Sequence, residues 1–253
     1  MRVLVVGGTG LVGSRVVARL EAAGHSAVPA SPKTGVDTIT GEGLAAAVDS
    51  ADVVVDVSNS SSFEERAVLH FFKTSTRHLL EAEEAAGVGH HVALSVVGTD
   101  RLAESPYFRA KIAQETLIAE ASVPYSIVRA TQFFEFLRGI ATAASDGDVV
   151  RLPQARIQPI AVDEVAASVA NIAVADPVNG IIEIAGPQAY RMDDLISRLL
   201  GASEDTSEVI TDPMARYFGA RLHDDTLLPG PDARIAETRF EDWILQHSEG
   251  SSR

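Results

Sequence analysis

The sequence of 253 residues predicts a doubly wound α/β fold, in which helices cover both faces of a parallel sheet. Two observations support this prediction. Short runs rich in valine, isoleucine and leucine alternate with longer segments whose apolar residues recur at helical spacing. The run at residues 53–57 also lacks a polar side, as is expected of a parallel strand that is buried on both faces.

The strands of the first half are expected where the apolar runs fall, at residues 3–6, 26–30, 36–40, 53–57, 92–96 and 125–129. The helices are expected where apolar residues repeat with the helical period, at residues 11–23, 42–50, 63–86 and 106–121. Gly24 and Gly87 follow two of these segments and can take the left-handed conformation that ends a helix. Pro106 fits the first turn of its helix, where its missing N–H costs no hydrogen bond.

After Ala130 the alternation is less regular. Helices are expected at residues 132–144, 163–175, 192–200 and around 240–244, and strands at residues 157–160 and 181–184. The Asp163 carboxylate is expected to cap its helix, whereas residues 203–233 are too rich in Asp, Pro and Gly for an assignment. The predicted organisation is a core of residues 1–131, a C-terminal portion of residues 132–247 that completes the core and forms a small substrate lobe, and a disordered tail at residues 248–253.

The composition limits the partners and the chemistry. A formal net charge of -14 disfavours nucleic acid and anionic membrane surfaces as partners. The absence of cysteine excludes disulfides, thiolate catalysis and cysteine-ligated zinc. The first residues lack the apolar segment of a signal peptide, and no run approaches the roughly 20 apolar residues of a membrane helix. We therefore expect a cytoplasmic monomer or homodimer that acts on a small molecule.

Two groups of polar residues are expected to be structural. His90 and His91 are adjacent, so on an extended segment their side chains point in opposite directions and do not converge on a metal ion. We expect this pair at the surface or at the start of a strand. Glu81, Glu83 and Glu84 are expected on a solvated helix face.

A glycine-rich turn follows the first strand. The motif G-x-G-x-x-G is formed by Gly8, Gly10 and Gly13, and it stands between an apolar strand and an amphipathic helix, which is the context that makes it informative. One glycine makes the tight turn, the next lets the backbone approach a pyrophosphate, and the third permits close helix–strand packing. The start of the helix offers N–H groups and a partial positive charge. The sequence thus predicts a Rossmann-type site for a nicotinamide dinucleotide, built from residues Gly7, Gly8, Thr9, Gly10, Leu11, Val12 and Gly13.

The choice between NAD and NADP depends on the end of the second strand. An acidic residue there binds the ribose 2′-hydroxyl, and a basic one accepts a 2′-phosphate. The local sequence is Pro29-Ala30-Ser31-Pro32-Lys33, which contains no carboxylate. Ser31 and Lys33 therefore favour NADP(H), with NAD(H) as the alternative if Lys33 is simply a solvated surface lysine.

A serine, a tyrosine and a lysine form the candidate catalytic group. Ser95 lies at the carboxyl end of the strand at residues 92–96, where ligands of open α/β sheets bind. Tyr107 and Lys111 are four residues apart on the next helix and so share a face. A lysine beside a tyrosine lowers the pKa of the phenol from its usual ~10 and eases proton transfer to a carbonyl oxygen. The alternative for Ser95 is a strand-end hydroxyl bonded to the backbone.

Six segments together resemble the short-chain dehydrogenase/reductase superfamily, and more narrowly its atypical NmrA-like branch. They are residues 7–13, 52–56, 87–95, 107–111, 124–133 and 158–166. The resemblance implies that the adenosine ribose is lined by Val57, Ser58 and Asn59. It also implies that the nicotinamide is bordered by Ala130, Thr131, Gln132 and Phe133, and that Lys111 binds the nicotinamide ribose.

The leading hypothesis is an NADPH-dependent reductase of a small carbonyl or quinone-type substrate. Tyr107 would donate the proton, Lys111 would position the ribose and Ser95 would orient the substrate oxygen. The second hypothesis is a non-catalytic redox sensor that binds NADP(H) and reports to a protein partner, because the tyrosine of NmrA-like proteins is often missing or idle. An epimerase or dehydratase acting on nucleotide sugars is a third reading, since it uses the same cofactor chemistry.

Overall fold

The computed structural model describes residues 1–203 and 205–248, and these form two compact units. The first unit contains Met1–Ser95, Pro106–Arg129 and Asp163–Ile182. The second unit contains Val96–Ser105, Ala130–Val162 and the described residues from Glu183 onward. The chain therefore leaves the first unit after Arg129 and later returns to it for twenty residues. The predicted disordered tail lies outside the described residues, apart from Ser248.

The central sheet has seven strands, β1 (Arg2–Val6), β2 (Ser26–Ala30), β3 (Val53–Asp56), β4 (His90–Val96), β5 (Tyr125–Ala130), β9 (Gly180–Ala185) and β12 (Arg234–Ile235). Their order is β12-β9-β5-β4-β3-β1-β2, and β1 pairs in parallel with both β2 and β3. This confirms the predicted doubly wound parallel sheet. The chain passes from β1 to β2 on one side and continues in β3 on the other. Ligands of such sheets bind at the carboxyl ends of the strands where the order reverses, which here is the gap between β1 and β3.

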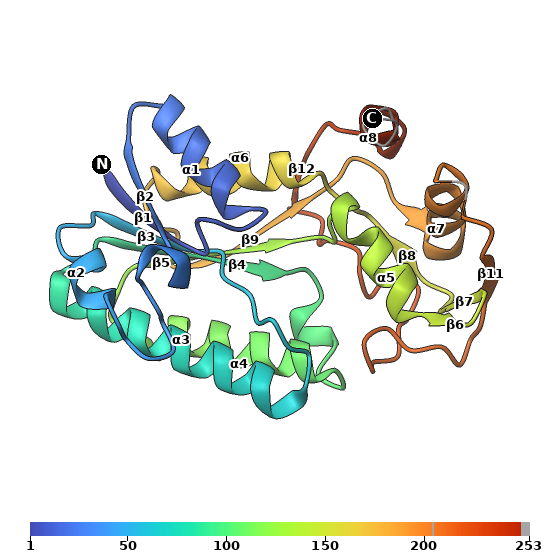
Figure 1. The fold of residues 1–253 in the computed structure, drawn as a ribbon, viewed down its shortest axis with the longest axis horizontal. Coiled ribbons are helices and arrows are strands. Elements are labelled where there is room, and N and C mark those ends of the chain that lie inside the picture. The colour runs from blue at the N-terminus through green and yellow to red at the C-terminus, as the bar shows by residue number, and fades with distance from the viewer. Residues whose placement is uncertain (204, 249–253) are drawn as a thin grey trace. The chain divides into compact units, whose positions relative to one another are not determined.

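Helices cover both faces of the sheet in the first unit. Figure 1 shows α3 (Glu65–Ala86) and α4 (Pro106–Glu120) side by side on one face, with α1 (Gly13–Ala22) and α6 (Val162–Ala173) on the other. Gly24 and Gly87 both have the predicted positive φ, +83° and +70°. Among the described residues, no helix is both long and apolar enough to cross a membrane.

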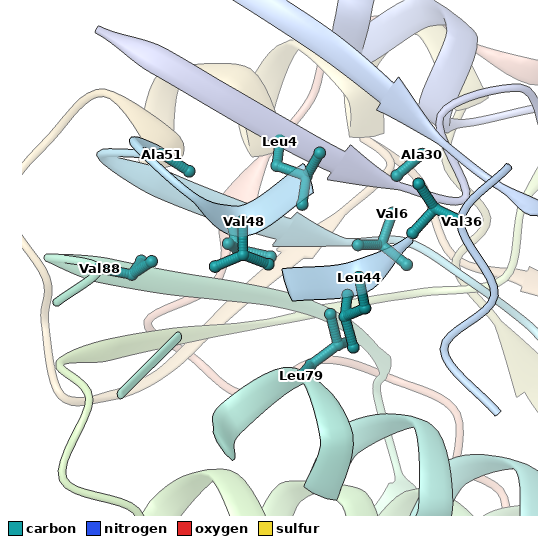
Figure 2. Packing of buried hydrophobic residues seen from close by; sticks show 10 residues of the cluster. Leu4, Val6, Ala30, Val36, Leu44, Val48, Ala51, Leu79 and Val88 are labelled. Atoms are coloured by element: carbon teal, nitrogen blue, oxygen red, sulfur yellow. The ribbon is translucent and has the colours of Figure 1, made fainter. Parts of the chain in front are cut away.

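An apolar cluster at one end of the sheet is shown in Figure 2. It joins β1 and β3 to α3 and to the short helix α2 (Leu44–Val48) through Leu4, Val6, Ala30, Val36, Leu44, Val48, Ala51, Val54, Leu79 and Val88. Burial of such side chains stabilises the fold by about 1.5–3 kcal/mol each. This cluster holds β1 in place, and β1 in turn positions the glycine-rich turn.

The predicted strand at residues 36–40 is wrong. The chain after β2 makes a single turn of 3-10 helix, η1 (Pro32–Thr34), and then a polar turn. The Asp37 carboxylate accepts hydrogen bonds from the backbone N–H of Ile39 at 2.7 Å and of Thr40 at 3.2 Å. An aspartate that bonds to the backbone two and three residues onward competes with a strand ladder. Val36 still packs in the core, so its apolar character reflects burial in a loop.

Asp163 is also not the helix cap that we predicted. The helix α6 begins at Val162, which places Asp163 in its first turn. Its carboxylate instead accepts a hydrogen bond from Arg15 Nε on α1 at 3.1 Å. The N–H of Val162 is within 3.2 Å of the Glu135 carboxylate, which performs the capping function from a distant part of the sequence.

The second unit adds small sheets and helices of its own. Its elements are η2 (Thr99–Arg101), η3 (Phe134–Phe136), α5 (Leu137–Ala143), β6 (Ser145–Asp146), β7 (Val149–Leu152), β8 (Arg156–Ile157), β10 (Tyr190–Arg191), α7 (Met192–Gly201), β11 (Glu208–Thr211) and α8 (Phe240–Ser248). The strands β11, β7 and β6 form one sheet, and β10 and β8 form another. Phe134 packs on Trp243, with ring centroids 5.4 Å apart, and both are buried. The β6–β7 hairpin was not predicted. Of the strand expected at residues 157–160, only Ile157 lies in a strand, β8, and Ile160 forms an isolated bridge with Phe133.

Candidate functional site

The glycine-rich turn is packed so closely that Gly8 and Gly13 have no room for a side chain. Gly7 has a φ of +78°, and its N–H donates to Ala30 O at 2.9 Å. A Cβ on Gly8 would lie 2.6 Å from Val5 O, and one on Gly13 would lie 2.1 Å from Gly7 O. The turn therefore requires glycine at these positions for its own packing.

Three backbone amides of this turn have no partner within the described chain. The N–H groups of Gly8 and Gly10 donate to Val5 O and Gly7 O, whereas those of Thr9, Leu11 and Val12 make no hydrogen bond there. The turn is also open, since Thr9, Gly10 and Leu11 are exposed. Free amides at the start of a helix suit a phosphate group, because the helix dipole adds a partial positive charge.

The strands on either side of β1 end beside this turn. After β2, the Ser31 hydroxyl is buried and has no hydrogen-bond partner among the described residues, while Lys33 is exposed on η1. After β3 come Val57 and Ser58, and a Cβ on Gly7 would lie 2.9 Å from Ser58 N. The structure thus places the residues predicted to line the adenosine ribose directly against the glycine-rich turn.

Lys111 on α4 is buried, with 2% of its surface exposed. Its ammonium donates to Leu94 O at 2.8 Å and to Gln114 Oε1, and it lies 4.5 Å from the centre of the Phe72 ring. Burial lowers the pKa of Lys111 to about 8, against the opposing effect of the carboxylates of Asp56 and Glu115. A lysine in this state changes charge within reach of physiological pH.

Tyr107 shares the predicted face of α4 with Lys111, but its hydroxyl has a different partner. It donates to Asn59 Oδ1 at 3.4 Å, and its ring packs on Phe63, Phe72 and Phe108. Burial raises the pKa of Tyr107 to about 12. The expected lowering of this pKa by Lys111 is therefore wrong, because the lysine is held by other groups and the phenol lies among aromatic rings.

Ser95 is placed at the carboxyl end of β4 as expected, but its side chain faces α4. It is 2% exposed, and its hydroxyl donates to Glu115 Oε1 at 2.5 Å. The same carboxylate receives Arg129 Nε at 3.0 Å and a second guanidinium nitrogen at 2.6 Å. The Ser95 hydroxyl therefore bonds to the carboxylate of a buried ion pair, and not to the backbone as the alternative for it predicted.

The residues predicted to border the nicotinamide lie in the second unit. Ala130 is buried and its carbonyl accepts a hydrogen bond from Val97 N at 2.9 Å, whereas Phe133 is half-buried. Thr131 and Gln132 are buried, and neither the Thr131 hydroxyl nor either amide atom of Gln132 has a partner among the described residues. Buried polar atoms are nearly always bonded in native proteins, so these groups are available to a ligand or a water molecule.

The two adjacent histidines lie at the start of β4, which confirms one of the two positions expected for them. Both are buried, so the expected surface position is wrong. His91 Nδ1 lies 2.9 Å from Glu83, and His90 Nε2 lies 2.8 Å from the Ser126 hydroxyl. Burial lowers the pKa of His91, but the Glu83 carboxylate outweighs this effect and the pKa is raised. The prediction that Glu83 is solvated is therefore wrong, because it lies on the face of α3 that packs on the sheet.

Sequence reasoning missed the buried polar residues behind the site. Asp56, Gln114, Glu115 and Arg129 all have less than a tenth of their surface exposed. A signal was present, because Asp56 ends an otherwise apolar strand. The residues at positions 111, 114 and 115 are also polar and lie on one face of α4 at spacings of three and four.

Solved proteins of the short-chain dehydrogenase/reductase superfamily share this fold, which confirms the predicted fold class. A solved NAD-dependent NDP-hexosamine 5,6-dehydratase, TunA, is similar over 100% of this chain and 98% of its own, with a TM-score of 0.75 and 17% identity. A short-chain dehydrogenase/reductase superfamily protein from Agrobacterium tumefaciens with bound NAD is similar over 99% and 97%, with a TM-score of 0.73 and 17% identity. The NADPH-dependent quinone oxidoreductase QOR2 of Escherichia coli, solved with NADPH, is similar over 84% and 78%, with a TM-score of 0.64 and 20% identity.

Two curated proteins are similar in sequence. The photosystem II assembly factor Ycf39 of a Synechocystis species is 28% identical over 153 residues, which cover 55% of this chain and 47% of that protein. The chloroplastic divinyl chlorophyllide a 8-vinyl-reductase of Oryza sativa subsp. indica is 29% identical over 239 residues, which cover 79% and 58%. The chain spans about half the length of these two relatives. No family model matches the chain.

Proposed function

We propose that this protein binds a nicotinamide dinucleotide and reduces a small carbonyl or quinone-type substrate. The observation that carries the proposal is the open turn at residues 8–13, whose three unpaired amides lie at the carboxyl end of β1. This end of the sheet is also where the strand order reverses, between β1 and β3. Both features fit the pyrophosphate of a dinucleotide.

The surrounding residues fit the rest of such a ligand. The closely packed glycines leave the backbone accessible to a phosphate, and the unpaired Ser31 hydroxyl offers a hydrogen bond beside it. Lys33 follows on the exposed side of η1 and adds a positive charge in a chain whose net charge is -14. A serine and a lysine without a carboxylate favour the 2′-phosphate of NADP(H). The structures of similar fold that hold NADPH or NAD support a nicotinamide dinucleotide in general.

The state of Tyr107 favours a quinone over a simple ketone as the substrate. When bound, the reduced nicotinamide supplies a hydride. A ketone that accepts a hydride becomes a localised alkoxide and needs a proton at once, whereas a quinone becomes a delocalised anion that water can protonate afterwards. With a pKa of about 12, Tyr107 stays protonated at neutral pH and can donate a hydrogen bond to the developing oxyanion. The reduction of a quinone by hydride transfer needs no more than this from the side chain.

The test is steady-state oxidation of NADPH against a panel of quinones and ketones, in wild type and in Tyr107→Phe. We expect turnover with quinones, and a turnover rate about 100- to 1,000-fold lower in the variant, the size of losing one positioned hydrogen-bond donor. The ring contacts with Phe63 and Phe72 are retained in Tyr107→Phe, so stability should be unchanged. Tyr125→Phe on β5 is the matched control and should behave as wild type. Full turnover in Tyr107→Phe would remove the tyrosine from the mechanism.

A non-catalytic redox sensor is the second candidate function, and one observation favours it. Ser95, Lys111 and Tyr107 each donate to a protein acceptor, and burial raises the pKa of Tyr107, so none of these three groups is set up as a strong acid. A sensor would bind NADPH and NADP⁺ with clearly different affinities and would not consume NADPH. Calorimetric titration with both nucleotides, together with the turnover assay, separates the two functions, because multiple turnovers exclude a purely sensing role.

A further inference from the structure

The ammonium of Lys111 is linked to a carboxylate through the side-chain amide of Gln114. Lys111 Nζ donates to Gln114 Oε1, and Gln114 Nε2 donates to Asp56 Oδ2 at 3.1 Å. An ammonium can only donate and a carboxylate can only accept, so the amide satisfies both neighbours in one orientation only. The three side chains therefore form a cation–amide–anion relay with a fixed direction.

Asp56 is the counter-ion of Lys111 in this relay. The other carboxylate that acts on Lys111 is that of Glu115 on the same helix. Glu115 is already paired with Arg129 through two contacts of 3.0 and 2.6 Å and also accepts from Ser95. The neighbouring helix α3 presents the Phe72 ring to the ammonium, and α4 presents the uncharged phenol of Tyr107 one turn away.

The second oxygen of Asp56 fixes another part of the candidate site. Asp56 Oδ1 accepts hydrogen bonds from the backbone N–H of Ser58 at 2.9 Å and from its hydroxyl at 2.6 Å. The backbone of Ser58 packs against Gly7, where a Cβ would lie 2.9 Å from Ser58 N. One buried carboxylate thus connects the helix that carries Lys111 to the loop that supports the glycine-rich turn.

We propose that Asp56 is the positioning residue of the nucleotide site, orienting Lys111 through Gln114 and Ser58 directly. Two of the three ammonium donors of Lys111 are used by Leu94 O and Gln114, so the relay leaves one donor for a ligand. The inference rests on the proposed function, because Lys111 has a ligand to position only if a nucleotide binds here.

The relay can be tested by moving its negative charge from position 56 to position 114, which lies next to Lys111 in the relay. Asp56→Asn leaves one acceptor oxygen for two arms. If that oxygen stays on Ser58, the new NH₂ group faces the NH₂ group of Gln114, so two donors meet. If Gln114 flips, its NH₂ group then faces the ammonium instead. Gln114→Glu places two carboxylates side by side. The double variant Asp56→Asn/Gln114→Glu restores a donor–acceptor match at both links, with the same total charge as wild type.

The measurement is the dissociation constant of NADPH and NADP⁺ at pH 7, by calorimetry, for the four proteins. We expect each single variant to bind about tenfold or more weakly, and the double variant to bind within about threefold of wild type. Glu120→Gln, an exposed position on the same helix, removes one charge without touching the relay and should bind as wild type. Ser58→Ala removes the hydroxyl bond to Asp56 and keeps the backbone N–H bond, so it weakens only the loop arm and should reduce affinity without changing the pH dependence described next.

The pH profile distinguishes positioning from general loss of structure. Burial lowers the pKa of Lys111 to about 8 although Asp56 opposes this effect. Affinity of wild type should therefore be constant below about pH 8 and fall above it. In Asp56→Asn the fall should begin at a lower pH, and in the double variant it should return to the wild-type position. The same order is expected for the titration of the Lys111 side-chain ¹⁵N signal without nucleotide.

The outcomes separate the two proposals. If wild type binds nucleotide but the double variant is no better than the singles, or Asp56→Asn binds as wild type, the relay is refuted and the proposed function stands. If wild type binds none of the four nicotinamide nucleotides at millimolar concentration, the proposed function fails, and the assignment of Asp56 to a nucleotide site fails with it. In that case an unshifted Lys111 signal in Asp56→Asn would show in addition that the relay itself is absent.

Discussion

Two alanine substitutions in the glycine-rich turn differ in their predicted effects because the space at the two positions differs. In Gly13→Ala the new methyl group would lie 2.1 Å from Gly7 O and 2.7 Å from Gly8 Cα, which are backbone atoms that cannot swing away. In Gly10→Ala the nearest atom is Gly7 O at 3.2 Å. Gly13 begins α1, where helix propensity alone would favour alanine by about 1 kcal/mol. Propensity and packing therefore predict opposite signs for the change in stability.

We expect packing to decide the result. Overpacking against backbone costs about 3 kcal/mol at the upper end of its usual range, which lowers Tm by roughly 6–12 °C in a chain of this size. Gly10→Ala should change stability by less than about 1 kcal/mol. It should nevertheless weaken nucleotide binding, because its methyl group adds bulk on the open side of the turn. Thermal unfolding and NADPH titration of both variants test this. A Gly13→Ala protein with unchanged Tm and affinity would refute the account of the turn.

Three further predictions concern the buried and exposed charges. The raised pKa of His91 means that its pairing with Glu83 contributes fully below about pH 6.5, the unfolded value, and is lost as the pH rises through the higher folded pKa. Glu83→Gln should therefore destabilise the protein by about 1–3 kcal/mol at pH 5.5 and by less at pH 9 in urea unfolding, and an equal loss at both pH values would contradict a charged pair. Ser95→Ala should cost about 1–2 kcal/mol of stability with little change in turnover per folded molecule, because the Ser95 hydroxyl donates to Glu115. A turnover rate lower by two orders of magnitude or more would restore Ser95 to the catalytic group. Lys33→Glu should weaken NADPH about tenfold or more and leave NADH unchanged, and equal effects on both nucleotides would remove Lys33 from 2′-phosphate binding.

The elements that could be predicted are those whose signal is local. Strand β3 has three consecutive valines before Asp56, and α3 combines a long helical period with a glycine at its end. The turn at residues 8–13 was predictable because its glycines are required by backbone packing, which any sequence with this fold must satisfy. The strand expected at residues 36–40 was wrong because the Asp37 side chain bonds to the backbone two residues onward and replaces the strand ladder.

The partners of polar side chains were much harder to predict than the elements that carry them. Lys111 and Tyr107 were correctly placed on one helix face, but their hydrogen-bond partners outside that helix come from β4 and the loop after β3. Glu83 was assigned to solvent from its charge alone, although it lies on the same face of α3 as the buried Leu79 and Leu80. Sequence spacing determines which face a residue occupies, whereas its pKa and its partner depend on contacts between elements that are distant in sequence.

The buried charges of the first unit are balanced, which is unusual in so acidic a chain. Three carboxylates, those of Asp56, Glu83 and Glu115, lie opposite three basic groups, those of Lys111, His91 and Arg129. Replacing buried ion pairs by apolar residues is often neutral or stabilising, so pairs of this kind are weak evidence for stability. Their arrangement gives a better reason for their presence. Asp56, Ser95 and Arg129 come from the carboxyl ends of three neighbouring strands, β3, β4 and β5, and face the polar side of α4. This is the end of the sheet that carries the glycine-rich turn, so the charged groups fix the position of α4 where a displacement of Lys111 would matter most to a bound nucleotide.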